Sequence, residues 1–463
     1  MNNKSGLSVA IIGGGFCGVM TLVQLVKQSA KPVNITLFNS VTPHARGTAF
    51  STYSSEHLLN VAAGNMSAFP ETKNHFVIWL KSLTEYSSLS LEEISKLYVP
   101  RNFYGDYLES ILEQCLQTLP NHVNCELIMA EVSSIKAGEN NYFITRTDGK
   151  TLEADKVVLA TGNHLPRSPF KEDHPLTNSG FYFENPWIRA SVNNLSEDKP
   201  VLIIGTGLTM VDVVLGLREQ NFKGKIIAVS PKGFHILPLR PHLPYTDILD
   251  EIKPPYKLLD LFKIFRKHIR KVKSENKSGE TVVDALRSKT QEVWHALDHN
   301  DRKRFMTHVR HLWGVARHRL PADVYARIQT MIGEGSLEIL AGRISNAVIN
   351  NTTVEITFKT RKDQSIKVFE VLRVINCTGP EADPSKFRSR LFKEMLNDGL
   401  VQIDDMSLGI KADEHGRIMD ANGNTTGKLF ALGSLLRGTL WETTAVPELR
   451  TQAAGIAELI LKK

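Results

Sequence analysis

Two stretches of the chain have the pattern of a buried strand, a glycine turn and a helix. The first is SVAIIGGGFCGVM at residues 8–20, and the second is VLIIGTGLTMVD at residues 201–212, about 190 residues further along. After each helix pattern a second apolar strand follows, VNITLFN in the first case and KIIAVS in the second. Each stretch therefore predicts a βαβ unit, in which two parallel strands are joined by a crossover helix.

The first glycine turn matches a dinucleotide-binding fingerprint. In Gly13-x-Gly15-x-x-Gly18 the first glycine permits the tight turn, the second lets the backbone approach a pyrophosphate, and the third allows close packing of helix on strand. The phosphates are then expected at the helix N-terminus, where unpaired N–H groups and the helix dipole favour negative charge. The acid that usually binds the ribose, about 20 residues further on, is here Asn39, a neutral acceptor.

The second turn departs from this fingerprint at one position. It has Gly205-x-Gly207, but Met210 stands where the third glycine would be, so either the helix lies farther from its strand or Met210 fills the gap. The following strand ends in Ser230-Pro-Lys232, without an acid. Because no carboxylate repels a 2′-phosphate there, the pattern favours NADP over NAD; a solvated surface lysine is the alternative for Lys232.

Two such turns in one chain are typical of flavoproteins in which a nicotinamide reduces a bound flavin, since the cofactors carry the chemistry and the protein orients them. The predicted cofactors are therefore FAD and NADPH. The last helix has Pro447 in its first turn, where proline is tolerated. Its positive end could face the flavin ring, although an ordinary amphipathic terminal helix fits the same residues.

The predicted fold class is α/β, with two Rossmann-like dinucleotide-binding domains (three-layer, with parallel sheets) and a helical insertion. A chain of 463 residues is longer than a single hydrophobic core usually supports. We expect an FAD-binding domain at 1–175 plus 376–463 and an NAD(P)H-binding domain at 195–240 plus 335–375. A helical insertion at 241–334 is expected to cover the cleft.

Composition excludes several classes of protein. The four cysteines are scattered without any C-x-x-C pair, which argues against a disulfide reductase, a zinc site and a disulfide-stapled secreted fold. The balance of 56 basic against 49 acidic residues, a net charge of +7, favours anionic ligands but does not indicate nucleic acid. With no signal peptide and no run of 18 apolar residues, we expect a cytoplasmic protein without an integral membrane segment.

Several further stretches together resemble one known group of proteins. They are GGGFCG, HLLNVAAGNMSAFP (57–70), YVPRNFYGDYL (98–108), ATG (160–162), IIGTGLTMVD, FMTHVRHLWGVARHRLP (305–321), INCTGP (375–380) and GTLWETTAVPELRTQA (438–453). The chain resembles the class B flavin monooxygenases over nearly its whole length. Closer still, it resembles a bacterial group of FAD/NAD(P)-binding flavoproteins allied to the flavin-dependent N-hydroxylases. One activity known in that group is the N-oxidation of aspartate to a nitro compound.

The resemblance implies a mechanism. NADPH would reduce FAD, O2 would add to the reduced flavin as a C4a-hydroperoxide, and one oxygen would pass to a nucleophilic N, S or carbonyl group. A small amine or amino acid is the expected substrate. Asn60 is the candidate for a hydrogen bond near the peroxide, in a region that must exclude water; Asn65 is an alternative equivalent, and a loop asparagine bonded to backbone is the ordinary interpretation.

The resemblance also implies the other site residues. Arg101 is similar to an arginine of an R-x-F-x-x-Y pattern near the flavin of N-hydroxylases, and Arg46 could meet the pyrophosphate; a surface ion pair is the alternative for both. The remaining cofactor contacts are expected at Phe16, Cys17, Met66, Thr161, Gly162, Leu208, Thr209, Gly379, Gly433, Trp441, Glu442 and Thr443.

The helical insertion is rich in basic residues. Arg317 or Arg319 could grip a substrate carboxylate or the NADP phosphate with two parallel bonds; a solvated basic face is the alternative. His308 and His311 share a helix face, as do His311 and His318, but without an acid or cysteine at a useful spacing no metal site is predicted. The basic amphipathic stretch 257–277 is interpreted as a helix over the cleft, with membrane-surface or partner binding as alternatives.

Three functions stay open at this point. The first is a monooxygenase that acts with O2 on a small-molecule substrate. The second is an FAD-dependent NAD(P)H oxidoreductase that passes electrons to a quinone or protein partner. The third is a non-catalytic flavoprotein with a basic insertion, which would bind polyanions in a strongly salt-dependent way. No nucleic-acid partner is expected, and the pattern leaves the substrate and a homo-oligomeric state open.

Overall fold

The structure is a computed structural model that describes residues 6–41, 43–240 and 243–462, and it divides the chain into two compact units. The first unit holds the chain up to Thr52, Val61–His164 and Glu381 onward. The second unit holds Tyr53–Asn60 and Leu165–Pro380. Each unit therefore contains one of the two glycine turns.

The first unit is built on a sheet with the order β15-β16-β7-β1-β2-β3. All neighbours in it are parallel except β15, which is antiparallel to β16. The strands are β1 (Leu7–Ile12), β2 (Val33–Asn39), β3 (Val123–Met129), β7 (Lys156–Leu159), β15 (Arg417–Met419) and β16 (Thr425–Ala431). The predicted first βαβ unit is confirmed, because β1 and β2 pair in parallel on either side of the crossover helix.

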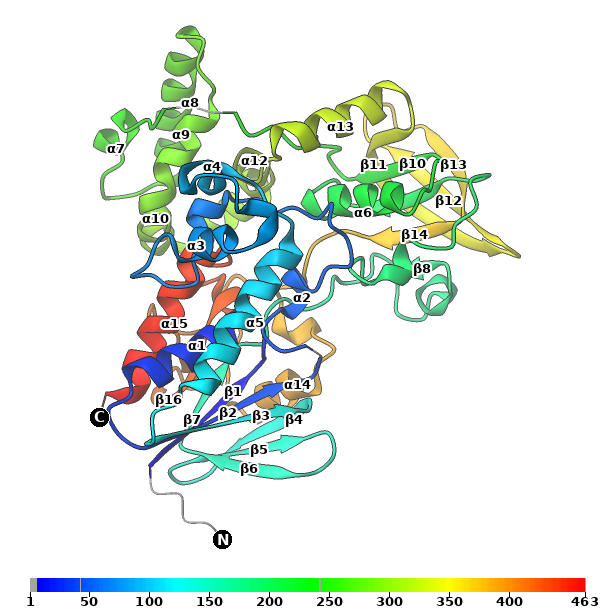
Figure 1. The fold of residues 1–463 in the computed structure, drawn as a ribbon. Coiled ribbons are helices and arrows are strands. Elements are labelled where there is room, and N and C mark those ends of the chain that lie inside the picture. The colour runs from blue at the N-terminus through cyan, green and yellow to red at the C-terminus, as the bar shows by residue number, and fades with distance from the viewer. Residues whose placement is uncertain (1–5, 42, 241–242, 463) are drawn as a thin grey trace. The chain divides into compact units, whose positions relative to one another are not determined.

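Helices cover one face of this sheet, and a small second sheet lies across the other (Figure 1). The helices of the unit are α1 (Phe16–Gln28), α2 (Gly47–Phe50), α3 (His75–Lys81), α4 (Leu91–Lys96), α5 (Arg101–Gln117), α14 (Arg390–Asn397) and α15 (Val446–Leu461). The small antiparallel sheet consists of β4 (Val132–Ala137), β5 (Tyr142–Arg146) and β6 (Thr151–Ala154). Helix α1 packs against α5 and α15, so the last helix of the chain lies beside the first one.

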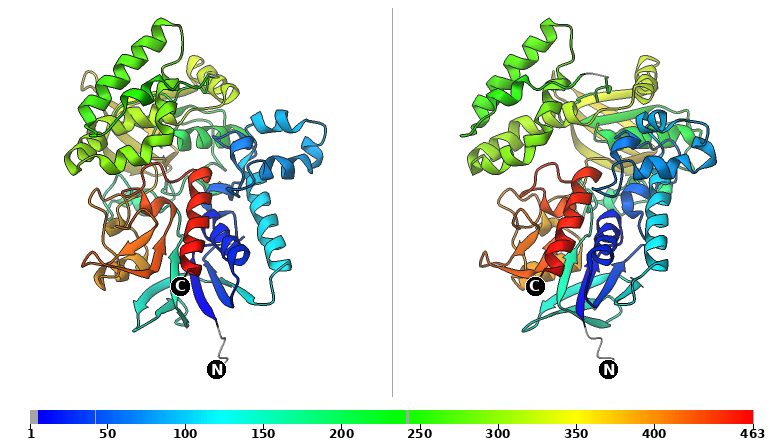
Figure 2. Two further views of the ribbon diagram at one scale, coloured as in Figure 1. Left: turned by 90° about the vertical axis from the view of Figure 1, so that its left-hand side faces the viewer. Right: turned by 60° about the vertical axis from the view of Figure 1, so that its left-hand side comes forward.

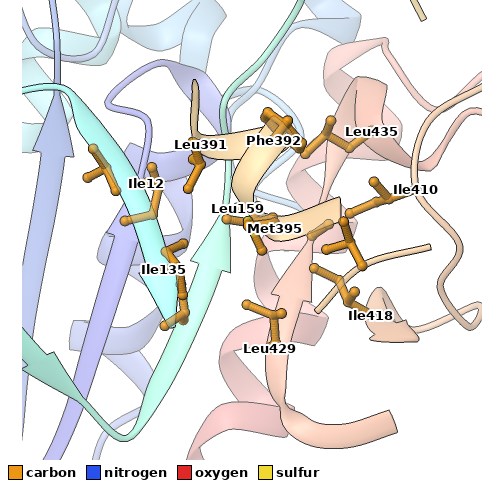
Figure 3. Packing of buried hydrophobic residues seen from close by; sticks show 14 of the residues in the cluster. Ile12, Ile135, Leu159, Leu391, Phe392, Met395, Ile410, Ile418, Leu429 and Leu435 are labelled. Atoms are coloured by element: carbon orange, nitrogen blue, oxygen red, sulfur yellow. The ribbon is translucent and has the colours of Figure 1, made fainter. Parts of the chain in front are cut away.

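The core beneath the small sheet joins segments from both ends of the chain (Figure 3). Ile12 and Leu159 from the main sheet meet Ile135 from β4 and Phe392 from α14, all of them buried. Burial of such side chains contributes about 1.5–3 kcal/mol each. This packing fixes the C-terminal ends of β1 and β7, from which the first glycine turn begins.

His164, at the end of the first unit's middle segment, is stacked on an aromatic side chain. Its ring lies on that of Phe387 with centroids 3.6 Å apart and has Phe392 at its edge. Burial lowers the pKa of His164 to about 4. The folded state therefore holds this imidazole neutral, with its Nε2 unpartnered among the residues that the structure describes.

Because His164 is held neutral in the folded state, we expect the free energy of unfolding to fall in acid. Its pKa rises from about 4 when folded to an ordinary value near 6.5 when unfolded, so only the unfolded chain takes up the proton between those values. The free energy of unfolding should therefore fall as pH falls through this window, by about 2–3 kcal/mol between pH 7.5 and pH 4.5. Urea unfolding of wild type and His164→Phe at both pH values measures the effect. The pH-dependent difference should shrink by this amount in His164→Phe and stay at the wild-type value in the surface control His415→Phe; an unchanged difference in His164→Phe contradicts it.

The second unit has a sheet with the order β13-β12-β11-β10-β9-β14-β8. Its strands are β8 (Tyr182–Phe183), β9 (Val201–Ile204), β10 (Ile226–Ser230), β11 (Leu337–Asn350), β12 (Thr353–Thr360), β13 (Ile366–Val371) and β14 (Arg373–Asn376). The strands from β8 to β11 are parallel, whereas β12 and β13 continue the edge as antiparallel hairpins. Short connections allow only antiparallel neighbours, which explains this edge.

The remaining helices of the second unit interrupt the sheet between β10 and β11 or cover it. They are α6 (Leu208–Glu219), α7 (Asp247–Glu251), α8 (Leu258–Ser274), α9 (Glu280–Ala285), α10 (Thr290–Ala296), α11 (His299–Arg304), α12 (Arg310–Arg317) and α13 (Ala322–Gly333). Helices α6 and α13 share a core with the sheet. Helices α7 to α10 enclose a separate core that includes Ile248, Leu261 and Val293. The α/β fold class with a helical insertion is thus confirmed.

The prediction that His311 and His318 share a helix face is wrong. Residues Phe305–Val309 form a turn of π-helix, and α12 ends at Arg317. His318 has an extended backbone beyond the helix end, so His311 and His318 do not share a helical face. The π turn precedes both histidines and does not change their relative placement, so the end of α12 before His318 is the cause.

Candidate functional site: two glycine turns

Two glycines of the first turn lie where no other residue fits. Gly13 has a φ of +116°, and a Cβ there would lie 2.3 Å from the carbonyl oxygen of Ala160 at the end of β7. A Cβ at Gly18 would lie 1.8 Å from the carbonyl oxygen of Gly13 itself. The predicted roles of these glycines, the tight turn and the close approach of helix to strand, are therefore visible in the geometry.

Gly15 lies where the backbone is open to a ligand. It is the N-cap of α1, and a Cβ there would make only an ordinary contact, 3.4 Å from the Cα of Gly47. No side chain within the described ranges caps this helix start. The N–H groups of the first turn, which includes Phe16 and Cys17, are left for another acceptor, and an anion is the acceptor that such a terminus favours.

Asn39 lies at the edge of this turn, as the fingerprint predicts for the ribose partner. Asn39 is the last residue of β2, and a Cβ added to Gly14 would lie 2.7 Å from the Cβ of Asn39. Its side-chain amide donates to the carbonyl oxygen of Val41, which leaves its Oδ1 as the acceptor that a ribose hydroxyl needs.

The C-terminal segment returns to the same turn. Ser434 donates a hydrogen bond of 2.5 Å to the carbonyl oxygen of Gly162, and a Cβ at Gly433 would lie 3.2 Å from the Sγ of Cys17. The N–H of Gly433 donates to Gln452 on α15, whose side-chain amide in turn donates to the buried Thr443. Gln452 and Ser434 could not be predicted from residue patterns, because their role depends on α15 packing beside α1.

These residues fit a flavin dinucleotide. The Oγ1 of Thr161 is buried without a hydrogen-bond partner among the described residues, one residue from the Ala160 carbonyl that touches the glycine turn. Glu442 adopts a left-handed φ of +61°, a conformation that is costly for a side chain other than glycine and that often marks a ligand-binding loop. Trp441 precedes it, and Met66 is buried in the same unit.

Four predicted residues outside the glycine turns lie in different surroundings. Arg46 donates a 2.8 Å bond to Glu109 and also pairs with Asp106, both on α5, so its guanidinium makes the ion pair that was the alternative prediction. Its contact with a pyrophosphate stays a prediction. Arg101 begins α5 in the same unit. Asn60 is exposed and belongs to the second unit, and Asn65 is exposed in the first, so their choice also stays a prediction.

The second turn repeats this arrangement in the second unit. Gly205 has a φ of +119°, and a Cβ there would lie 2.2 Å from the carbonyl oxygen of Cys377. Gly207 is the N-cap of α6, with nothing within 4 Å of an added Cβ. Met210 is 1% exposed and belongs to the core between α6 and the sheet, so it fills the gap left by the missing third glycine. Leu208 and Thr209 then form the first turn of α6.

Positive charge gathers beyond the end of β10. The hydroxyl of Ser230 accepts from the N–H of Gly233 at 2.9 Å, and half-buried Lys232 follows. The pKa of His311 on α12 is lowered by burial and by the positive charges of Arg310 and Lys232, which lie near it. Gly379, with a φ of +91° and open space around it, ends the corresponding loop after β14.

Arg317 and Arg319 lie together and share one carboxylate. The Nη1 of Arg317 is 3.1 Å from Asp284 on α9, and the Nη2 of Arg319 is 2.5 Å from the other oxygen of the same side chain. Arg319 is 7% exposed, and its Nε and Nη1 are buried without a partner among the described residues. The sequence did not reveal Asp284, because 33 residues separate it from Arg317.

Comparisons with known proteins agree with this geometry. Residues 10–164 match a family model described as FAD-NAD(P)-binding. The ornithine N-hydroxylase of Kutzneria sp. 744, solved with reduced FAD, NADP+ and L-ornithine, aligns with a TM-score of 0.66 at 13% identity over 98% of both chains. The L-lysine 6-monooxygenase of Pseudomonas syringae aligns with a TM-score of 0.66 at 15% identity over 98% of this chain and 99% of that one.

The chain has the fold of the flavin-dependent N-hydroxylases. A bacillithiol disulfide reductase from Staphylococcus aureus aligns less well, with a TM-score of 0.56 at 12% identity over 98% of this chain and 97% of that one. A comparison with curated proteins finds no match. These matches confirm the predicted resemblance and the predicted binding of FAD and NAD(P).

In the part of the chain that the structure describes, no group of three or more His, Cys, Asp and Glu side chains is placed to hold a metal ion. Within the same ranges, no helix has both the length and the apolar character needed to cross a bilayer.

Proposed function

We propose that the protein is an FAD-dependent, NADPH-reduced monooxygenase that oxygenates the nitrogen of a small amine or amino acid. The observation that carries this proposal is the pair of glycine turns, one in each unit. Each has a first glycine that no other residue can replace and a second glycine with open backbone at a helix start. Once bound, FAD would accept a hydride from NADPH and react with O2, which is chemistry that protein side chains lack.

In this proposal the protein supplies binding and orientation. The first turn of α1 binds the FAD pyrophosphate, and Asn39 accepts from the ribose. Asn60 or Asn65 donates a hydrogen bond beside the reacting flavin atoms, and Arg101 adds positive charge. The N-terminus of α15, which has Pro447 in its first turn, stabilises the negative charge of the reduced flavin.

The NADPH preference is proposed to come from the cations beyond β10. Ser230 and Lys232 would bind the 2′-phosphate, and Arg310 near them would add charge from α12. Lys232→Ala should raise the KM for NADPH roughly 10- to 100-fold, because charge-assisted hydrogen bonds contribute about 1.5–3 kcal/mol. The KM for NADH should stay unchanged, since NADH has no 2′-phosphate. Steady-state kinetics with both nucleotides measure this; the matched control is Lys223→Ala in the same unit, and an equal loss for both nucleotides would contradict the assignment.

The substrate class is proposed from the cluster of Arg317, Arg319 and Asp284. Arg319 has two buried donors, Nε and Nη1, without a partner among the described residues, and a carboxylate is an acceptor that guanidinium donors favour. An amino acid carries such a carboxylate together with a nucleophilic nitrogen. The fold neighbours named for ornithine and lysine support this class. We propose that the protein acts on this small molecule with O2 in the cytoplasm.

A substrate screen tests the proposal. The purified holoenzyme is mixed with NADPH, O2 and, in turn, L-aspartate, L-ornithine, L-lysine and cadaverine. The products are analysed by mass spectrometry with 18O2, and hydrogen peroxide is measured in parallel. One accepted amine should gain a single 18O atom per NADPH consumed. Peroxide alone with every amine would move the assignment to the second candidate.

That second candidate is an FAD-dependent NAD(P)H oxidoreductase that passes electrons to a quinone or protein partner. The alignment with a disulfide reductase favours it at the level of fold. A dithiol mechanism is disfavoured, because burial raises the pKa of Cys17 to about 12 and that of Cys377 well above its ordinary value, which suppresses the thiolate. Quinone-dependent oxidation of NADPH under nitrogen would identify this activity.

A further inference from the structure

Helix α8 has one buried face and one strongly basic exposed face. Leu261, His268 and Val272 are buried and face the core of the insertion. Figure 2 shows α8 along the outer side of the insertion. The cationic residues on its exposed positions are Lys263, Arg266, Lys267, Arg270, Lys271 and Lys273.

Half of these cations pair with a carboxylate among the residues that the structure describes. Lys263 pairs with Asp260 at 3.2 Å, Lys267 with Glu251 at 2.7 Å, and Lys271 with Asp247 at 2.8 Å. Within the described ranges, Arg266, Arg270 and Lys273 have no carboxylate within 4.0 Å. Their spacing of four and then three residues places them along one line of the helix, and we call these three residues the basic stripe.

Two large apolar side chains continue this line toward the start of the helix. Leu259 is 64% exposed and Phe262 is 40% exposed. They precede Arg266 by seven and four residues, so they lie on the same side as the basic stripe. The guanidinium of Arg266 lies over the ring of Phe262, 5.9 Å from its centroid. Single exposed apolar residues are ordinary, but here two of them extend a row of unpaired cations.

We propose that this face of α8 docks on an anionic lipid surface, with the basic stripe at the headgroup phosphates and Leu259 and Phe262 in the boundary between headgroups and acyl chains. Cations attract anionic lipid but hold it only within a Debye length. Apolar side chains add the second contribution that stable membrane binding needs. A nucleic acid or an acidic protein would satisfy the cations alone and would leave Leu259 and Phe262 without a role.

Vesicle sedimentation of the full-length holoprotein tests the proposal. Wild type should bind vesicles of equal parts phosphatidylglycerol and phosphatidylcholine and should not bind pure phosphatidylcholine. Combined replacement of Arg266, Arg270 and Lys273 by alanine should lower the partition coefficient on the order of 100-fold, since each cation near the surface contributes about a fivefold factor. The control replaces Arg361, Lys362 and Lys393, which are exposed and far along the chain, and removes the same net charge. Equal losses in the two triple variants would overturn the proposal.

A second variant separates lipid from other polyanions. Leu259→Ser with Phe262→Ser should weaken vesicle binding at least tenfold, because buried apolar area is lost. It should leave binding to single-stranded RNA at the same salt unchanged. Tight RNA binding by wild type without vesicle binding would instead show a nucleic-acid surface and overturn the lipid proposal. All these positions are exposed, and FAD content with the thermal midpoint verifies that each variant is folded.

Discussion

Gly15→Ala is expected to give a folded protein that has lost its flavin. The added Cβ would make only an ordinary contact with Gly47, and the φ of Gly15 is −83°, which alanine adopts without strain. The same Cβ would occupy the position where the backbone must approach the pyrophosphate. FAD affinity should fall by at least about 100-fold, equivalent to roughly 3 kcal/mol, because several charge-assisted bonds at the helix start lengthen together. Absorbance near 450 nm and the thermal midpoint measure flavin content and folding.

Gly18→Ala is the companion to this variant. Its Cβ would lie 1.8 Å from the carbonyl oxygen of Gly13, a backbone atom that cannot move without shifting β1 from α1. This variant should lose stability by about 3 kcal/mol or more, as overpacking and backbone displacement do. Gly455→Ala on α15, where an added Cβ meets nothing within 4 Å, is the control. If Gly15→Ala kept full FAD content, the first turn would not bind the pyrophosphate.

Gly207→Ala should leave FAD content and stability unchanged and should abolish efficient reduction by NADPH. Nothing lies within 4 Å of the added Cβ, so the apoprotein accommodates it. The pyrophosphate of the nicotinamide cofactor is expected at the same position, at the start of α6. The rate of flavin reduction divided by NADPH concentration should fall about 30- to 100-fold, or 2–3 kcal/mol. Anaerobic stopped-flow absorbance measures it.

Gly205→Ala and Gly180→Ala are the two comparison variants for Gly207→Ala: the first should destabilise the fold, and the second should change nothing. A Cβ at Gly205 would lie 2.2 Å from the Cys377 carbonyl oxygen at a φ of +119°, so the second unit should unfold more easily. Gly180 has open space around it and should behave as wild type. Normal reduction of Gly207→Ala by NADPH would mean that the nicotinamide cofactor does not use the second turn, and the two-dinucleotide account would fail.

Much of the fold follows from short-range patterns in the sequence. Val- and Ile-rich runs such as VLII form buried parallel strands, and the glycines after them have the conformations that the fingerprint requires. The antiparallel edge β12–β13 and the π turn at Phe305–Val309 were not predicted in that form. The hairpin depends on hydrogen bonds between strands, and the π turn depends on the hydrogen-bond spacing within one helix. Residue type alone specifies neither.

In the candidate site, the backbone geometry of the glycine turns could be predicted from the sequence, whereas the ion-pair partners of its charged side chains could not. Gly13 and Gly205 are defined by their own φ and by one neighbouring carbonyl. Arg46 and Arg319, by contrast, depend on which carboxylates lie nearby, and their partners Glu109 and Asp284 are 63 and 35 residues away. Ion-pair partners so distant in the chain leave no periodic signal in a single sequence.

The central claim is that NADPH reduces a bound FAD, which then reacts with O2 to oxygenate a nitrogen. The most direct measurement is stopped-flow absorbance of the yellow protein, reduced anaerobically with one equivalent of NADPH and then mixed with O2 and an amine. The account predicts full reduction, a transient absorbance at roughly 370–390 nm before oxidised flavin returns, and little hydrogen peroxide. Failure of both NADPH and NADH to reduce the flavin, or immediate reoxidation with stoichiometric peroxide in the presence of every amine, would contradict it.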